Sequence, residues 1–197
     1  SEMCIRDRPH TGFEDQETHQ HLSAPEKIIL KIIRCFKEKK KGGSRMQDSY
    51  GRTIDYIRIS VTDQCNLRCI YCMPEGCIQK VPKQMLNDDQ MLMLCRCFAQ
   101  LGVSRVKITG GEPLLRPQVP ALIKEIRQIP GIRSVTLTTN GILLKKYLPQ
   151  LVKAGLTGVN ISIDSLNSVH YQQISGRDRL LPVMDSLKAA LSYPELV

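Results

Sequence analysis

The 197-residue sequence lacks the features that would point to a membrane or to a nucleic-acid surface. No apolar run approaches the roughly 20 residues of a membrane-spanning helix. Aromatic residues make up only 5% of the chain, and no arginine-rich arm carries interleaved aromatics. The net charge of +9 fits nucleotides and phosphates as well as nucleic acid, so it decides nothing alone. We expect no membrane and no nucleic acid among the partners.

Cysteine is too sparse for a small disulfide scaffold, which would be shorter and richer in this residue. The chain has eight cysteines, and three of them fall at positions 65, 69 and 72. This clustering indicates a functional site in a reducing compartment, and we expect a cytoplasmic protein.

Residues 1–45 differ in composition from the rest of the chain. They begin at Ser1 rather than methionine, and they contain a polar stretch, an apolar helical pattern at 28–36 and a lysine run at 37–41. We interpret 1–45 as a non-native or disordered extension with a short basic amphipathic helix. Met46 is then the expected native start.

From Met46 onward, each strand pattern is followed by a helix pattern. The strand patterns cover Ile54–Thr62, Arg105–Thr109, Ser134–Thr138 and Gly158–Ile163. The helix patterns cover Asp88–Leu101, Gln118–Gln128, Leu143–Ala154 and Leu180–Leu191. This order predicts an α/β fold of about four βα units with parallel strands.

Each strand pattern has one apolar face and one polar face, because side chains alternate along a strand. The polar faces carry Arg58, Ser60, Thr62, Lys107, Thr109, Thr136, Thr138, Asn160, Ser162 and Asp164. A parallel sheet with helices on both faces would be apolar on both. The simplest architecture is a partial TIM-type barrel, apolar outward and polar toward a hydrated or ligand-filled cavity. An exposed, half-open sheet face is the alternative.

The three clustered cysteines have the spacing C-x3-C-x2-C and follow the first strand pattern directly. Thiolates are the natural ligands of iron–sulfur clusters, which usually take four of them. Three thiolates from Cys65, Cys69 and Cys72 would leave one iron of a four-iron cluster open to a reacting ligand. The alternative is structural zinc, which needs four ligands, and Cys77 could supply the fourth.

A Gly-Gly-Glu-Pro segment at 110–113 follows the second strand pattern. Glycines allow a backbone to approach a ligand closely, and Glu112 offers an acceptor for a cationic group. Alone this would be a weak turn signal. One βα unit after the cysteines, it becomes a strong one.

With these two motifs in place, residues 46–197 resemble the radical S-adenosylmethionine (SAM) superfamily, and within it the GTP 3′,8-cyclase family of molybdenum cofactor biosynthesis. The segments that carry the resemblance are DSYGRTIDYIRISVTDQCNLRCIYCMP at 48–74, KITGGEPLLR at 107–116, LTTNG at 137–141, NISIDSL at 160–166 and ISGRDRL at 174–180. Gln64 is a mild departure, since arginine is common before the first cysteine.

The resemblance implies a role for each motif residue. Cys65, Cys69 and Cys72 would hold a [4Fe–4S] cluster whose open iron binds SAM. Contacts to SAM are implied for Tyr71, Gly110, Gly111, Glu112 and Ser162, and contacts to GTP for Arg58, Lys107 and Thr138. The GTP residues and Ser162 all lie on the polar strand face, so the two arguments agree on the ligand side of the sheet.

The implied reaction removes the C3′ hydrogen of GTP and joins C3′ to C8 of guanine. The product is (8S)-3′,8-cyclo-7,8-dihydroguanosine 5′-triphosphate. The family's chains continue with further strands and a second [4Fe–4S] cluster, so we expect 46–197 to be a truncated N-terminal part of the barrel that cannot complete cyclisation alone. Expected partners are GTP, a one-electron reductant such as a flavodoxin or ferredoxin, a downstream cyclic pyranopterin monophosphate synthase and a second copy in a homodimer.

Two other functions remain open from the sequence. A peptide-modifying radical SAM enzyme would share the cysteines and Gly-Gly-Glu-Pro but need not share Arg58, Lys107 or Thr138. A non-catalytic zinc or iron–sulfur binding module with a basic surface is the second alternative, and metal analysis separates it from the others.

Overall fold

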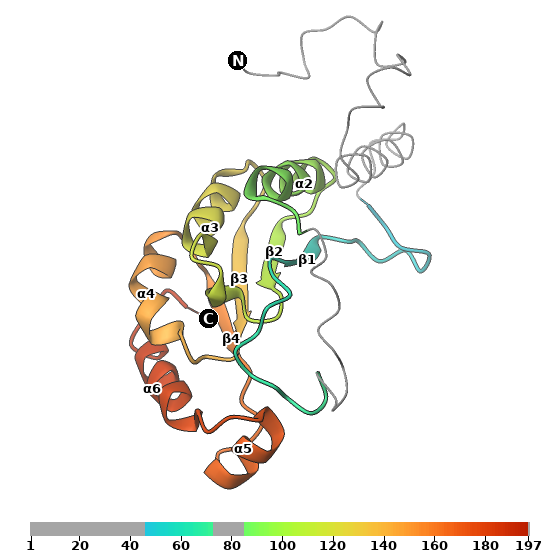
Figure 1. Ribbon diagram of the computed structural model, residues 1–197. Helices are drawn as coiled ribbons and strands as arrows, with labels where there is room; N and C mark the ends of the chain where they lie inside the picture. Colours follow the sequence, from blue (N-terminus) through green and yellow to red (C-terminus); the bar gives the residue numbers. More distant parts are fainter. Residues whose placement is uncertain (1–45, 73–84, 197) are drawn as a thin grey trace, which may run out of the picture. The chain divides into compact units, whose positions relative to one another are not determined.

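A computed structural model describes residues 46–72 and 85–196 (Figure 1). Every described residue belongs to one compact unit, Ser44–Val197. The expected N-terminal extension with its basic helix and the candidate fourth ligand Cys77 lie outside the described residues.

Four parallel strands form one sheet in the order β1-β2-β3-β4. Their bounds are Tyr56–Ser60 for β1, Arg105–Thr109 for β2, Ser134–Thr139 for β3 and Gly158–Ile161 for β4. Strands that follow one another in sequence therefore lie side by side in the sheet. This confirms the expected parallel α/β fold with about four βα units.

Helices connect and follow the strands. Their bounds are Asp88–Gln100 for α2, Val119–Gln128 for α3, Leu144–Lys153 for α4, Ser168–Ser175 for α5 and Leu180–Ala190 for α6, with a short 3-10 helix η1 at Pro113–Leu115. Helices α2, α3, α4 and α6 follow one another along one side of the sheet (Figure 1). None of the helices in the described ranges has the length and apolar character to cross a membrane.

The start of α2 shows how local chemistry fixes a helix end. The Asn87 side chain accepts a hydrogen bond from the Gln90 backbone N–H at 2.9 Å, and the Gln90 side chain accepts one from the Asn87 N–H at 3.1 Å. This reciprocal capping satisfies two N–H groups that the helix itself leaves unpaired. The helix begins at Asp88 for that reason.

The core lies between the helices and the apolar face of the sheet. Val106, Ile108, Val135 and Leu137 are each 1% exposed or less. Burying one such side chain stabilises the fold by about 1.5–3 kcal/mol. These residues belong to one buried cluster that also contains Ile123, Ile126, Leu148 and Leu151 from α3 and α4.

The opposite face of the sheet is polar, as the alternation predicts. Arg58 and Asn160 are exposed, while Lys107, Thr136 and Thr138 are half-buried. The observed asymmetry between the faces matches a segment of a barrel wall more closely than a sheet covered on both sides.

The expected strand bounds were too long at three ends, one of which is the end of the first strand, at Ser60 rather than Thr62. The first strand begins at Tyr56 rather than Ile54, because the Ile54 N–H bonds the Met46 carbonyl in a local turn at 2.8 Å. The fourth ends at Ile161 rather than Ile163, although the Ser162 N–H still bonds the Thr139 carbonyl at 2.9 Å. The four expected helices agree with the observed ones to within a residue at each end, and α5 was not expected at all.

Candidate functional site

The motifs found in the sequence meet at one edge of the sheet. The cysteine loop, defined here as residues 65–72, follows β1, and Gly110–Pro113 follow β2. Asn140 and Gly141 follow β3, and Ser162 follows β4. Parallel strands end at the same edge of a sheet, which is where ligands bind in α/β folds. The sheet therefore gathers these four segments.

The Gly-Gly-Glu-Pro turn packs directly against the chain that leads into the cysteine loop. The Gly111 N–H donates to the Thr62 carbonyl at 2.7 Å, and the Glu112 N–H donates to the Gln64 carbonyl at 2.7 Å. A Cβ at Gly111 would lie only 2.1 Å from the Gln64 carbonyl oxygen. The close approach that requires glycine is thus between two segments of the chain itself, and the expected contacts of Gly110 and Gly111 with SAM stay predictions.

The carboxylate of Glu112 is buried and forms hydrogen bonds within the protein. It is 0% exposed. One oxygen accepts from the Thr139 hydroxyl at 2.7 Å and from the Leu114 N–H at 3.0 Å, and the other accepts from the Asn140 N–H at 2.7 Å. Glu112 thereby joins the end of β3 to the turn after β2. The sequence predicted an acceptor for a ligand cation, a role that stays a prediction beside these three internal bonds.

Burial raises the pKa of Glu112 above its ordinary value, and the hydrogen bonds from Asn140, Leu114 and Thr139 lower it only in part. A carboxyl group with a raised pKa in the folded state binds its proton more tightly there than in the unfolded chain. The stabilisation that this raised pKa gives the folded state is therefore fully present below the unfolded pKa of the carboxyl group. It is lost as pH rises through the folded pKa.

We expect the difference in unfolding free energy, wild type minus Glu112→Gln, to fall as pH rises from the ordinary carboxyl range toward neutrality. Glutamine does not titrate, so the titration of all other groups cancels in this difference. At neutral pH the variant should be less stable by about 1–3 kcal/mol, because its amide cannot accept all three bonds. Urea unfolding of both proteins across this pH range measures the effect. A difference that is flat or rises with pH would contradict it.

The cysteine loop presents its three thiols at different depths. Cys65 and Cys69 are half-buried, and Cys72 is exposed. The Leu67 N–H donates to the Cys65 sulfur at 3.4 Å. Burial raises the pKa of Cys69; a hydrogen bond from Tyr71 opposes this, and negative charge on neighbouring groups adds to it.

The donor set of this loop fits an iron–sulfur cluster by its chemistry. Three soft thiolates fall within eight residues, and a backbone N–H already points at one sulfur. Within residues 46–72 and 85–196, no three His, Cys, Asp or Glu side chains are arranged to hold a single metal ion. In an iron–sulfur cluster each thiolate binds a different iron. The three sulfurs therefore need not surround a single point, as the ligands of a single metal ion must.

The cysteine loop also rests on α5, a helix that sequence reasoning missed. The Arg68 N–H donates to the Ser175 carbonyl at 2.9 Å, and the Ile70 N–H donates to the Ile174 carbonyl at 3.0 Å. These two bonds flank Cys69. The signal available in the sequence was the segment ISGRDRL at 174–180, which supplies both carbonyls.

A side-chain bond adds to this support. The Tyr71 hydroxyl donates to Asp164 Oδ2 at 2.9 Å, across 93 positions of the chain. Burial and the acceptors Asp164 and Cys69 raise the pKa of Tyr71, so it keeps its proton as a donor at neutral pH. Tyr71 as a whole residue is 60% exposed, so the desolvation is confined to its hydroxyl end, which faces Asp164.

We expect Gly176→Ala to destabilise the protein by about 2 kcal/mol, more than Gly155→Ala, which should cost about 1 kcal/mol. Both glycines have positive φ, at +71° and +89°, so alanine is strained at either position. At Gly176 the new Cβ would also lie 2.8 Å from the Arg68 carbonyl oxygen, whereas at Gly155 it meets only the flexible Arg127 side chain at 3.3 Å. Urea unfolding compares the two. Equal losses would mean that the contact with the cysteine loop is unimportant.

The residues that the sequence predicts to contact GTP lie on the same polar face of the sheet. Arg58 and Lys107 are register partners on β1 and β2, and Thr138 lies on the same face of β3, opposite Asn160. The Thr138 hydroxyl is buried and has no hydrogen-bond partner among the described residues. A buried hydroxyl without a partner is costly, which suits a position that a polar ligand completes.

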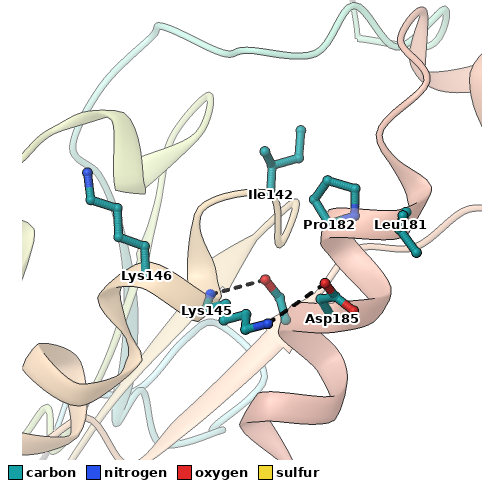
Figure 2. Close-up of a pocket in the computed structure, with 7 residues that line it drawn as sticks. Ile142, Lys145, Lys146, Leu181, Pro182 and Asp185 are labelled. Carbon is teal, nitrogen blue, oxygen red and sulfur yellow. Dashed lines mark hydrogen bonds and ion pairs between the residues drawn. The ribbon is translucent and has the colours of Figure 1, made fainter.

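A separate surface pocket lies between the first turns of α4 and α6 and contains none of the expected site residues. Ile142, Lys145, Lys146, Leu181, Pro182, Asp185 and Ser186 line it. The Lys145 backbone N–H donates to the Ser186 hydroxyl at 3.0 Å. The Lys145 ammonium lies 3.8 Å from the Asp185 carboxylate, which it faces in Figure 2. Such exposed ion pairs contribute little to stability.

The fold, the thiol-rich loop and the glycine turn packed against it define a class of enzymes that generate radicals from SAM. The profile of the radical SAM superfamily matches residues 59–194, and the chain belongs to this superfamily. Its members bind a [4Fe–4S] cluster and SAM.

Within the superfamily, the chain is similar to curated proteins of molybdenum cofactor biosynthesis. The chain is 49% identical over 147 residues to a GTP 3′,8-cyclase of Petrotoga mobilis. The aligned segment covers 74% of this chain and 46% of that relative. Over the same share of this chain it is 44% identical to molybdenum cofactor biosynthesis protein 1 of Bos taurus, of which it covers 23%. The chain thus spans less than half the length of these relatives.

Two solved structures share the fold. BtrN in complex with AdoMet and 2-DOIA has a TM-score of 0.53 at 22% identity, over 77% of this chain and 57% of that one. HydG, a maturase of the [FeFe]-hydrogenase, has a TM-score of 0.52 at 17% identity, over 88% and 46%. Together with the parallel sheet and its alternating helices, this confirms a partial TIM-type barrel.

Proposed function

We propose that this protein is a radical SAM enzyme that converts GTP to (8S)-3′,8-cyclo-7,8-dihydroguanosine 5′-triphosphate in molybdenum cofactor biosynthesis. The observation that carries the proposal is the joint presence of the cysteine loop and the polar strand face. Arg58, Lys107 and Thr138 lie on that face, in a chain that is 42–49% identical to several GTP 3′,8-cyclases.

In this proposal the cysteine loop holds the cluster, and residues at the strand ends contact SAM. Cys65, Cys69 and Cys72 hold the [4Fe–4S] cluster. When bound, the cluster supplies the electron that cleaves SAM to methionine and a 5′-deoxyadenosyl radical. The residues proposed to contact SAM are Tyr71, Gly110, Gly111, Glu112 and Ser162.

The polar strand face holds the substrate. The guanidinium of Arg58 and the ammonium of Lys107 lie in register on neighbouring strands, an arrangement suited to the charge of a triphosphate. The unpartnered hydroxyl of Thr138 supplies a further polar contact. These residues fix the nucleotide so that its C3′ hydrogen is presented for abstraction before C3′ joins C8 of guanine.

The remaining roles belong to the whole protein. We propose a second [4Fe–4S] cluster beyond the residues present in this sequence, a one-electron reductant such as a flavodoxin or ferredoxin, and a homodimeric state. A cyclic pyranopterin monophosphate synthase would consume the product in the cytoplasm. Residues 46–197 then form the N-terminal part of the barrel, preceded by an extension at 1–45.

Anaerobic reconstitution of the 197-residue chain with iron and sulfide tests the proposal. We expect a bound [4Fe–4S] cluster, reductive cleavage of SAM to 5′-deoxyadenosine, and GTP binding that weakens in Lys107→Ala. Cyclised nucleotide should not form at an ordinary enzymatic rate. Zinc without iron would favour the metal-binding module, and SAM cleavage without any GTP binding would favour a peptide-modifying enzyme.

A further inference from the structure

Asn140 stands between the glycine turn and the cysteine loop and contacts both. Its backbone N–H donates to Glu112 Oε2 at 2.7 Å. Its side-chain Nδ2 donates to Asn66 Oδ1 at 2.7 Å and lies 3.9 Å from the Cys65 sulfur, within reach of an N–H···S hydrogen bond. One residue at the end of β3 thus contacts the loop next to its first thiol.

The orientation of the Asn140 amide follows from its partners. Asn140 Oδ1 accepts a hydrogen bond from the Ile142 N–H at 3.1 Å, which only an oxygen can do. Nδ2 must therefore face the other way, toward Asn66 and Cys65. Asn66 Oδ1 accepts one of the two amide hydrogens, which leaves the second for the sulfur.

An N–H group beside a cysteine sulfur stabilises the thiolate. The stabilisation is larger when the attached cluster gains an electron, because the negative charge on the sulfurs then increases. Hydrogen bonds to the sulfurs are among the factors that set the reduction potentials of iron–sulfur clusters. Cys65 already takes one donor from the Leu67 backbone at 3.4 Å, and Asn140 provides a second from a side chain.

We propose that Asn140 is a positioning residue that donates a hydrogen bond to the Cys65 thiolate and raises the reduction potential of the cluster, an inference that rests on the proposed cluster site. The residue acts through Cys65 rather than on the substrate. Its anchor on the buried Glu112 holds the amide in place relative to the loop.

Redox titration of the reconstituted 197-residue chain, followed by electron paramagnetic resonance, tests this inference. Asn140→Ser and Asn140→Asp both keep an oxygen that can accept from the Ile142 N–H, but both remove the amide donor. At the wild-type midpoint, we expect the ratio of oxidised to reduced cluster in Asn140→Ser to rise about three- to tenfold. A tenfold change corresponds to about 59 mV for one electron. Asn140→Asp should shift further in the same direction, because it adds negative charge.

Asn87→Ser is the matched control, since it makes the same substitution at the exposed N-cap of α2, where serine also caps a helix. Its midpoint should equal that of the wild type. Unchanged midpoints in both Asn140 variants, with iron and sulfide content intact, would overturn the inference and leave the proposed function standing. Loss of the cluster from both Asn140 variants would also overturn it, because the amide would then serve assembly. Absence of a cluster in the wild type would defeat the proposed function itself.

Discussion

Replacing Cys69 by alanine is expected to abolish cluster binding and SAM cleavage, whereas replacing Cys95 by alanine should leave both intact. Cys69 lies in the middle of the cysteine loop, half-buried, between the two backbone bonds that fix the loop on α5. A [4Fe–4S] cluster held by three thiolates cannot lose one of them without losing a corner. Iron content should fall from about four per chain to background, and 5′-deoxyadenosine should not form.

Cys95 is the matched control because it is also a non-disulfide cysteine but sits in the core. It is 0% exposed, and burial raises its pKa to about 12, so it remains a neutral thiol at neutral pH. Cys95→Ala should cost about 1 kcal/mol of stability through lost packing. Iron analysis, SAM cleavage and urea unfolding of both variants separate the two effects. Retention of a full cluster in Cys69→Ala would refute the ligand assignment.

Gly111→Ala is expected to lower the free energy of unfolding by about 3 kcal/mol or more and to reduce iron incorporation. The added Cβ would lie 2.1 Å from the Gln64 carbonyl oxygen, 2.6 Å from its carbonyl carbon and 2.8 Å from the Asp63 oxygen. All three atoms belong to the backbone, so no side-chain rotation relieves the overlap. The turn and the chain that enters the cysteine loop must separate, which breaks the Gly111 bond to Thr62.

Gly131→Ala provides the comparison for this variant. Its φ of +96° strains alanine, but the nearest atom to its Cβ is 3.8 Å away, so only the backbone term of about 1–2 kcal/mol applies. Iron incorporation in Gly131→Ala should match that of the wild type. If Gly111→Ala were no worse than Gly131→Ala in unfolding and iron content, the packing of the glycine turn on the cysteine entry would not matter for the site.

The order of strands and the two faces of the sheet could be predicted from the sequence because both are local properties. The alternation of apolar and polar residues predicts which face of each strand is buried. On β2, Ile108 is buried in the core, and its neighbour Lys107 lies half-buried on the polar face. The motif residues could be placed at one edge because they directly follow the strands. Strand lengths were overestimated where a turn withdrew an N–H, as at Ile54.

Tertiary contacts determine the features that the sequence did not reveal. Helix α5 has eight residues, of which only Tyr171 and Ser175 are buried, so it has almost no apolar period to detect. Asn140 appeared in the sequence only as part of the segment LTTNG at 137–141, and its contact with Cys65 depends on two strand ends meeting. The internal bonds of Glu112 likewise come from the end of β3, 27 and 28 positions away.

The contact between the cysteine loop and α5 sets an order of events during synthesis. Arg68 leaves the ribosome 107 positions before Ser175, whose carbonyl accepts its backbone hydrogen bond. At translation rates of about 5–20 residues per second, roughly 5–20 seconds pass before the loop can reach its final support. During that interval the cysteine loop of the nascent chain lacks its two backbone bonds to α5. Iron and sulfide delivered to the finished chain would meet a loop already held in place, whereas delivery during translation would not.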